Sequence, residues 1–150
     1  KATGSGINDV VEQQFDIGRE VLASGLVPII EPEVDIGCPE KEKAEGLLRD
    51  QLMKHLDILP EGSEVILKLT LPQIDDFYAD CISHDRTLRV VALSGGYSRV
   101  ESNERLSRQR GMIASFSRAL TEGLGVDQTE DEFNSMLDSS ITSIVDASKT

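Results

Sequence analysis

Short apolar runs alternate along this chain with longer stretches in which apolar residues recur every three or four positions. The short runs have the length and β-branched content of buried strands, and they span residues 26–31, 65–69, 88–93 and 112–116. Helical periodicity spans 7–22, 44–56 and 133–145, with shorter helices expected at 77–82, after Ser98 and at Arg118. This order is typical of βα units, whose strands form a parallel sheet that is buried on both faces. The sequence therefore predicts a single α/β domain over residues 1–150.

Several residues at the helix ends have side chains that favour a helix start or stop. The expected N-caps are Asn8 or Asp9, Ser98 paired with Glu101, and Thr129 paired with Glu132. Gly25 is expected to end the first helix. The last helix is expected to carry an apolar face of Phe133, Leu137, Ile141, Ile144 and Val145. Residues 1–6 indicate a loop between elements, so we expect the chain to be cut from a longer protein.

Composition and charge narrow the classes of function. The chain has 39% apolar residues, enough for a packed core, and a net charge of −12 at pH 7. Nucleic acids and anionic membranes are bound through clustered lysines and arginines, so neither is expected as a partner. Cys38 and Cys81 lack the spacing of zinc ligands or of a disulfide scaffold, which favours a reducing cytoplasm. No apolar run approaches the roughly 18 residues of a membrane helix, and no stretch has the pattern of a signal peptide.

A lysine interrupts the apolar strand at 65–69. Burying the amine of Lys68 in a parallel sheet is costly unless a partner or a function compensates for it. Desolvation exposes a neutral amine, which attacks carbonyl groups to form an imine that accepts electrons during C–C cleavage. Two structural explanations stay open: Lys68 could reach water from a strand end, or it could pair with an acid.

Two carboxylates follow the strand at 26–31. Glu31 lies at the C-terminal end of that strand, and Glu33, two residues on, is expected on the same side. Two close like charges favour protonation of one of them, which gives a general acid or base beside an imine-forming lysine. The alternative is a polar, solvated loop between a strand and a helix.

Ser94, Gly95 and Gly96 close the strand at 88–93 immediately before a helix. Their N–H groups and the hydroxyl could bind phosphate, and Arg118, after the next strand, could supply a guanidinium. A tight glycine turn and an ordinary surface arginine are the structural alternatives. The acids thus follow one strand, the lysine lies on the next, the glycine loop follows the third and the arginine follows the fourth. This order matches strands five to eight of a (β/α)8 barrel with its site at the C-terminal strand ends.

Four motifs in this order resemble the class I fructose-bisphosphate aldolases, most closely their bacterial members. They are Val27-Pro-Ile-Ile-Glu-Pro-Glu-Val34, Leu67-Lys68, Leu93-Ser-Gly-Gly96 and Ser115-Phe-Ser-Arg-Ala-Leu120. The resemblance covers the chain from Ile7 to about Ser148. It implies the C-terminal portion, about strands five to eight, of a (β/α)8 TIM barrel.

This resemblance also implies a reaction and roles for the site residues. Lys68 would form a Schiff base with dihydroxyacetone phosphate or the keto-sugar, Glu31 would be the acid/base, and Glu33 would assist by hydrogen bonding near the lysine. The residues that match the family's phosphate contacts are Ser94, Gly95, Gly96 and Arg118. The implied reaction is the reversible cleavage of fructose 1,6-bisphosphate to dihydroxyacetone phosphate and glyceraldehyde 3-phosphate in glycolysis and gluconeogenesis. No metal or other cofactor is implied, because the imine does what zinc does in class II enzymes.

The chain departs from the family pattern in several respects. It ends Asp146-Ala-Ser-Lys-Thr150 without the C-terminal tyrosine of the animal enzymes, Leu69 stands where they have proline, and Ser117 where they have glycine. The family's first four strands, which carry an aspartate and basic residues of the sugar site, are absent from the sequence. We therefore expect this chain alone to be inactive or feeble. The sequence leaves the oligomeric state open, homo-oligomers included.

Two other functions stay open from the sequence. One is a different imine-forming barrel that acts on sugar phosphates, such as a transaldolase or a smaller aldolase. The other is a stand-alone doubly wound α/β domain that binds a phosphorylated ligand without chemistry. The second alternative predicts that borohydride never traps a substrate on Lys68.

Overall fold

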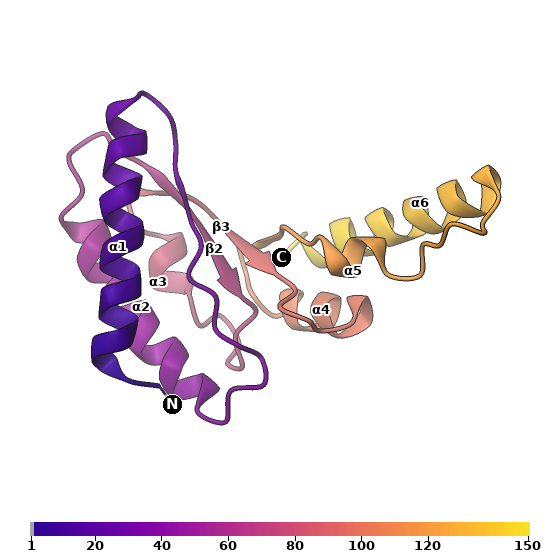
Figure 1. Ribbon diagram of the computed structural model, residues 1–150, viewed down its shortest axis with the longest axis horizontal. Helices are drawn as coiled ribbons and strands as arrows, with labels where there is room; N and C mark the ends of the chain where they lie inside the picture. Colours follow the sequence, from indigo (N-terminus) through magenta and orange to yellow (C-terminus); the bar gives the residue numbers. More distant parts are fainter. Residues whose placement is uncertain (1) are drawn as a thin grey trace.

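The computed structural model describes residues 2–150 as a parallel sheet with helices packed around it (Figure 1). The helices are α1 (Gly4–Ala23), α2 (Lys41–Asp57), α3 (Ala79–Ile82), α4 (Arg99–Leu106), α5 (Arg118–Thr121) and α6 (Glu130–Ala147). The strands are β1 (Ile29–Ile30), β2 (Val65–Thr70), β3 (Thr87–Leu93) and β4 (Ile113–Ala114). Their order in the sheet is β1-β2-β3-β4, and every neighbouring pair is parallel. The predicted α/β class is confirmed.

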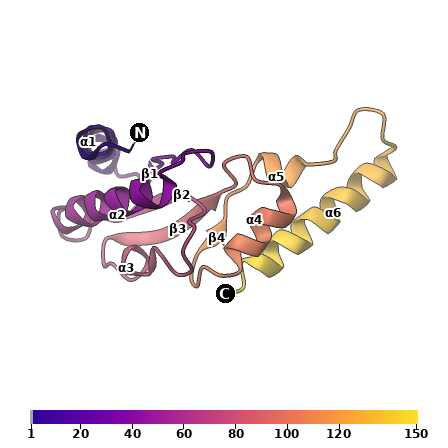
Figure 2. The ribbon, with the colours of Figure 1, turned by 90° about the horizontal axis from the view of Figure 1, so that it is seen from below.

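The two ends of the sheet carry different helices (Figure 2). The helices α1 and α2 pack together beside β1 and β2, and α4, α5 and α6 form a second group beside β4. Between the two groups, β2 and β3 form the long central pair, in which Lys68 lies opposite Val91 and Thr70 opposite Leu93. Among residues 2–150, no helix combines the length and the apolar character that crossing a bilayer requires.

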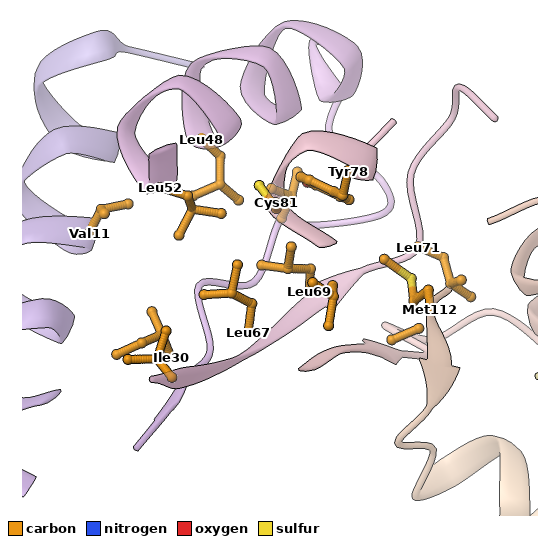
Figure 3. Close-up of a cluster of buried hydrophobic side chains, with 14 of the residues drawn as sticks. Val11, Ile30, Leu48, Leu52, Leu67, Leu69, Leu71, Tyr78, Cys81 and Met112 are labelled. Atoms are coloured by element: carbon orange, nitrogen blue, oxygen red, sulfur yellow. The ribbon is translucent and has the colours of Figure 1, made fainter. Parts of the chain in front are cut away.

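Side chains alternate between the two faces of β2, and this alternation sets the direction of Lys68. Leu67 and Leu69 are fully buried among the side chains of α2 and α3, where Figure 3 shows Leu48, Leu52 and Cys81 close to them. Burying a leucine side chain contributes about 1.5–3 kcal/mol, so these two residues fix the face of β2 that meets the helices. Lys68, between them, projects to the opposite face.

The first helix begins earlier than the sequence predicted. Neither Asn8 nor Asp9 caps it; the N-cap is Thr3, whose side chain makes no capping hydrogen bond, and residues 4–6 form the first turn instead of a loop. The backbone N–H of Ile7 closes that turn on the carbonyl of Thr3. Packing of Val11 and Phe15 stabilises the helix from its centre, so the start does not depend on a side-chain cap. Gly25 ends the helix as predicted, with φ of +78°.

The edge strands are shorter than the sequence predicted. The run at 26–31 forms a strand only at Ile29–Ile30, and the run at 112–116 only at Ile113–Ala114. Within residues 2–150, each edge strand has a single neighbour, so fewer of its backbone groups are paired than in β2 and β3. Pairing still extends past the assigned ends, because the Pro28 carbonyl accepts from the Ile66 N–H and Ser115 donates to the Ala92 carbonyl.

The predicted helix caps have mixed outcomes. Thr129 and Glu132 form the complete capping box of α6. At α4, Ser98 accepts from the Glu101 N–H, but the carboxylate of Glu101 pairs with Arg105 instead of reaching back to the N-cap. The helix predicted at 77–82 is assigned only from Ala79.

The apolar face of α6 is largely open to solvent in this chain. Phe133 is 39%, Ile141 43% and Val145 47% exposed, whereas the buried residues of the helix are Ser140 and Ala147. The helices α4 and α5 contact the side of α6 that carries small residues, where Asn103 of α4 donates to the Ser143 hydroxyl. Small side chains allow the backbones to approach closely, so they face the neighbouring helix and the larger apolar residues point away.

The packing predicts different reactivity for the two cysteines. Cys81 is buried, and burial raises the pKa of its thiol to about 12, whereas Cys38 is half-buried in the loop before α2. Because the thiolate is the reactive form, a thiol reagent at pH 8 should modify Cys38 quickly and Cys81 only as fast as the chain unfolds. Mass mapping after timed labelling measures both rates. The C38S variant should lose only the fast phase of labelling. Fast labelling of Cys81 in that variant would contradict the burial of Cys81 in the core.

Candidate active site

The predicted site residues come together at the carboxyl end of the sheet. Glu31 directly follows β1, Lys68 belongs to β2, Ser94 directly follows β3, and Arg118 opens α5 just beyond β4. One cavity of about 140 Å³ is lined by Glu31, Glu33, Lys68, Leu93, Ser94, Gly95, Ser115, Ser117 and Arg118. Gly96 is at its rim, because a Cβ atom built there would lie 3.9 Å from Nη1 of Arg118. Parallel strands bring their carboxyl ends to one edge, so residues up to 87 positions apart meet here.

Lys68 and Glu31, which both line this cavity, form an ion pair. The lysine Nζ lies 2.6 Å from Oε1 of Glu31, and the two side chains are 22% and 45% exposed. The sequence alternative in which the lysine pairs with an acid therefore occurs, and the pairing is also compatible with chemistry. A half-exposed ion pair contributes only about 0–1 kcal/mol to stability, so the fold does not require it. At this distance the carboxylate can accept a proton from Nζ directly.

The backbone of Glu31 is held by the neighbouring helix. Its N–H donates to the side-chain carbonyl of Gln14 in α1 over 2.7 Å. This bond gives a partner to a backbone group at the open edge of the sheet, where no further strand lies in the described chain. Glu33, two residues on, reaches the same cavity, as the sequence predicted. The cavity therefore receives two carboxylates from one loop, on the β1 side of the lysine.

The glycine turn after β3 has a conformation that other residues rarely adopt. Gly95 has φ of +62° and Gly96 of +113°, and Ser94 before them is buried. Within residues 2–150, neither glycine N–H finds a hydrogen-bond acceptor. Free N–H groups in such a turn form a concave donor site for an anion.

Arg118 complements this turn from the β4 side. Its side chain is exposed and, within residues 2–150, no carboxylate lies at ion-pair distance from it. A planar guanidinium can bind phosphate through two parallel hydrogen bonds. The cavity therefore has carboxylates at one end, a lysine in the middle, and anion donors at the other end.

Sequence reasoning missed three polar residues at this site. Ser115 and Ser117 line the cavity, but neither of them was given a role there from the sequence. Their signal was present, since both follow a strand at the same edge as the glycine turn. Thr70, at the end of β2, is fully buried and accepts a hydrogen bond from the Val34 N–H over 2.9 Å. Nothing in the sequence distinguished this threonine from others in strands.

A larger hollow lies away from this site. It is an open depression beside α6 that includes Arg99, Asp127, Asp131 and Glu132. Its arginine is already engaged, because the guanidinium of Arg99 donates to the backbone carbonyls of Ala119 and Glu122, and the backbone N–H of Arg99 donates to the Glu122 carboxylate. The smaller cavity at the strand ends is therefore the better candidate, because it combines a lysine, carboxylates and unpaired donors.

The sequence of this chain is similar to those of known proteins that share one name. No protein-family model matches the chain. It is 60% identical over 149 residues to "Fructose-bisphosphate aldolase class 1" of Synechocystis sp., which covers 99% of this chain and 50% of that protein. Proteins of the same name match from Porphyromonas gingivalis, at 58% identity over 99% of this chain and 50% of the relative, and from Clostridium acetobutylicum, at 53% over 100% and 51%. The chain thus spans about half the length of these relatives.

The matched region, at 53–60% identity over essentially the whole chain, spans the positions of all four motifs on which the resemblance was based. The resemblance inferred from the residues is therefore confirmed: along 99–100% of its length, this chain is similar to about half of each of these proteins named class 1 fructose-bisphosphate aldolase.

Proposed function

We propose that this chain supplies the Schiff-base lysine and the phosphate site of a class I fructose-bisphosphate aldolase. The observation that carries the proposal is the contact of 2.6 Å between Lys68 Nζ and Glu31 Oε1, in a cavity that also holds the glycine turn and Arg118. The ligands are small sugar phosphates, in keeping with local positive groups on a chain whose net charge is −12.

In the proposed reaction, Glu31 first accepts a proton from Lys68. The neutral amine then adds to the keto carbon of fructose 1,6-bisphosphate, and the resulting carbinolamine loses its hydroxyl group as water after Glu31 returns the proton. This leaves a protonated imine between Nζ and the former carbonyl carbon. Glu33, from the same loop, is close enough to the cavity to assist by hydrogen bonding near the lysine.

The imine then accepts the electrons of the breaking bond. A carboxylate takes the proton of the C4 hydroxyl, the bond between C3 and C4 breaks, and its electron pair moves into the imine to form an enamine. Glyceraldehyde 3-phosphate leaves. Protonation of the enamine at C3 and addition of water to the imine release dihydroxyacetone phosphate and restore Lys68. Each proton that leaves the substrate is returned in the second half of the cycle.

The phosphate next to the keto carbon would bind at the other end of the cavity. The Ser94 hydroxyl, the N–H groups of Gly95 and Gly96, and the guanidinium of Arg118 provide donors there. The carboxylates lie on the β1 side of the lysine and these donors on the β3 and β4 side. The substrate would therefore place its phosphate away from the carboxylates, which favours one orientation of the reacting carbons.

We propose that these residues are the C-terminal half of a (β/α)8 barrel, with β1 to β4 as its strands five to eight. Both edge strands have one free side, and the relatives are twice as long. A hollow of about 390 Å³ lies between α1 and the open edge of β1, lined by Ile17, Val27 and Ile29 among others. These three side chains are exposed apolar residues, which suits a further parallel strand beside β1. The chain alone would then be inactive or feeble.

Trapping with borohydride tests the proposed role of Lys68. Sodium borohydride with dihydroxyacetone phosphate should reduce an imine on Lys68 to a stable adduct, which peptide mass mapping locates. The experiment uses this chain and an enzyme completed by the half of the Synechocystis relative that the chain does not match, called the completed enzyme below. We expect the adduct in the completed enzyme, its loss in K68R, and its retention in K54R, which changes an exposed lysine of α2.

The same experiment separates the alternatives. An adduct on Lys68 without cleavage of fructose 1,6-bisphosphate would favour another imine-forming aldolase or a transaldolase. No adduct in either protein would favour a phosphate-binding domain without chemistry. Turnover by the 150-residue chain alone would contradict the expectation that it needs the missing half.

Substitution of Arg118 tests the phosphate site. In the completed enzyme, R118M should raise KM for fructose 1,6-bisphosphate by about 10- to 100-fold, because it removes charge-assisted hydrogen bonds of about 1.5–3 kcal/mol. Trapping of unphosphorylated dihydroxyacetone on Lys68 should change little, since that ligand has no phosphate to lose. The control R19M removes a surface arginine of α1 that pairs with Asp16. Equal losses with both ligands would place Arg118 outside the phosphate site.

A further inference from the structure

The loop between β1 and α2, residues 31–40, begins with both carboxylates of the site and is called the acid loop here. Its backbone is tied to the lysine strand by one buried hydrogen bond, in which the Val34 N–H donates to Oγ1 of Thr70 over 2.9 Å. Thr70 is fully buried and lies two positions after Lys68, on the same side of β2. Val34, the residue next to Glu33, is therefore bonded to Thr70, the next residue after Lys68 on the same side of β2.

The acid loop also touches the glycine turn. A Cβ atom built on Gly95 would lie 2.8 Å from Cγ2 of Ile36 and 3.4 Å from Cγ2 of Thr70, and one on Gly96 would lie 3.3 Å from Cδ1 of Ile36. The Ile36 side chain thus occupies the space that the glycines leave free. The acid loop, strand β2 with its lysine, and the turn at Gly95 and Gly96 therefore meet at Thr70 and Ile36.

A buried ion pair fixes the far end of the acid loop to the same place. Lys41, the first residue of α2, pairs with Glu45 in the interior and donates to the Leu71 carbonyl over 2.8 Å. Glu45 in turn accepts from the Gln73 N–H over 3.3 Å. The acid loop is therefore held on both sides of Ile36 by residues that directly follow Lys68 in the chain, which leaves it little freedom to move relative to the lysine.

We propose that Thr70 is a positioning residue of the active site. It sets the distance of Glu31 and Glu33 from Lys68 through the Val34 backbone, and Ile36 transmits this position to the glycine turn. Phosphate bound at the glycine turn and proton transfer at Lys68 are then coupled through direct contacts. The inference rests on the proposed function, since it assigns Thr70 and Ile36 to the same site.

The T70V variant in the completed enzyme tests this role. Valine has nearly the shape of threonine but no oxygen, so the Val34 N–H loses its acceptor and the acid loop can shift. We expect kcat for cleavage of fructose 1,6-bisphosphate to fall about 10- to 100-fold, because small displacements of catalytic groups have effects of that size. KM should change less than kcat, since the substitution removes none of the phosphate donors and reaches the glycine turn only through Ile36. Borohydride trapping on Lys68 should slow together with kcat.

Two controls distinguish positioning from a general effect on stability. T70S keeps the oxygen and loses only a methyl group, so it should retain kcat within about threefold even where its Tm falls. T87V makes the same substitution at the opposite end of the sheet, where the Thr87 hydroxyl has no partner among the described residues, and it should leave kcat unchanged. Equal losses of kcat in T70V and T70S, in step with Tm, would overturn the proposal, as would an unchanged kcat in T70V.

The I36A variant tests the coupling independently, and it decides the matter if T70V does not fold. It should reduce the advantage of dihydroxyacetone phosphate over dihydroxyacetone in the rate of trapping on Lys68 by about tenfold or more. An unchanged ratio would overturn the coupling. If the unmodified completed enzyme shows no trapping on Lys68, the proposed function is refuted, and the positioning role with it. If the unmodified enzyme shows trapping and both T70V and I36A keep full activity, the positioning role alone is refuted.

Discussion

The two-residue period of β2 is the constraint on which the site depends. Leu67 and Leu69 are fully buried on the helix-covered face, and Lys68 must therefore project to the other face, together with Thr70. A shift of one residue in register would exchange these two sets and expose two leucines while burying the lysine under α2. The cost of that exchange far exceeds the strength of any contact made by Lys68 itself. The core thus determines where the amine of Lys68 points, and the ion pair with Glu31 follows from it.

The parts of the fold predicted correctly are those in which local pattern and burial agree. Apolar runs with partners on both sides, such as 65–69 and 88–93, become full strands, and the Thr129–Glu132 pair becomes a capping box. The site was also predictable in outline, because parallel strands bring residues that follow them to one edge. The lengths of the edge strands were predicted wrongly, since the sequence does not show that β1 and β4 each pair with a single neighbour among residues 2–150.

Other features depended on contacts that no local pattern contains. The first helix starts at Gly4 because tertiary packing at Val11 and Phe15 supports it, and its start needs no side-chain cap. The side of α6 that packs inward carries Ser140 and Ala147, which a search for large apolar residues passes over. The hydrogen-bond partner of Thr70, Val34, lies 36 residues away in the sequence. These contacts join distant segments, so a single sequence gives no sign of them.

The two lysine–glutamate pairs of this chain show why burial alone does not identify a reactive lysine. Lys41 is the more buried of the two, but its ammonium is held both by Glu45 and by the Leu71 carbonyl, and it does not line the cavity at the strand ends. A buried pair of this kind fixes geometry, and removal of one partner leaves an uncompensated charge. Lys68 has one carboxylate partner and an adjoining cavity with unpaired donors. It can therefore give up its proton to Glu31 and still have space for a carbonyl carbon, whereas Lys41 can only hold the acid loop in place.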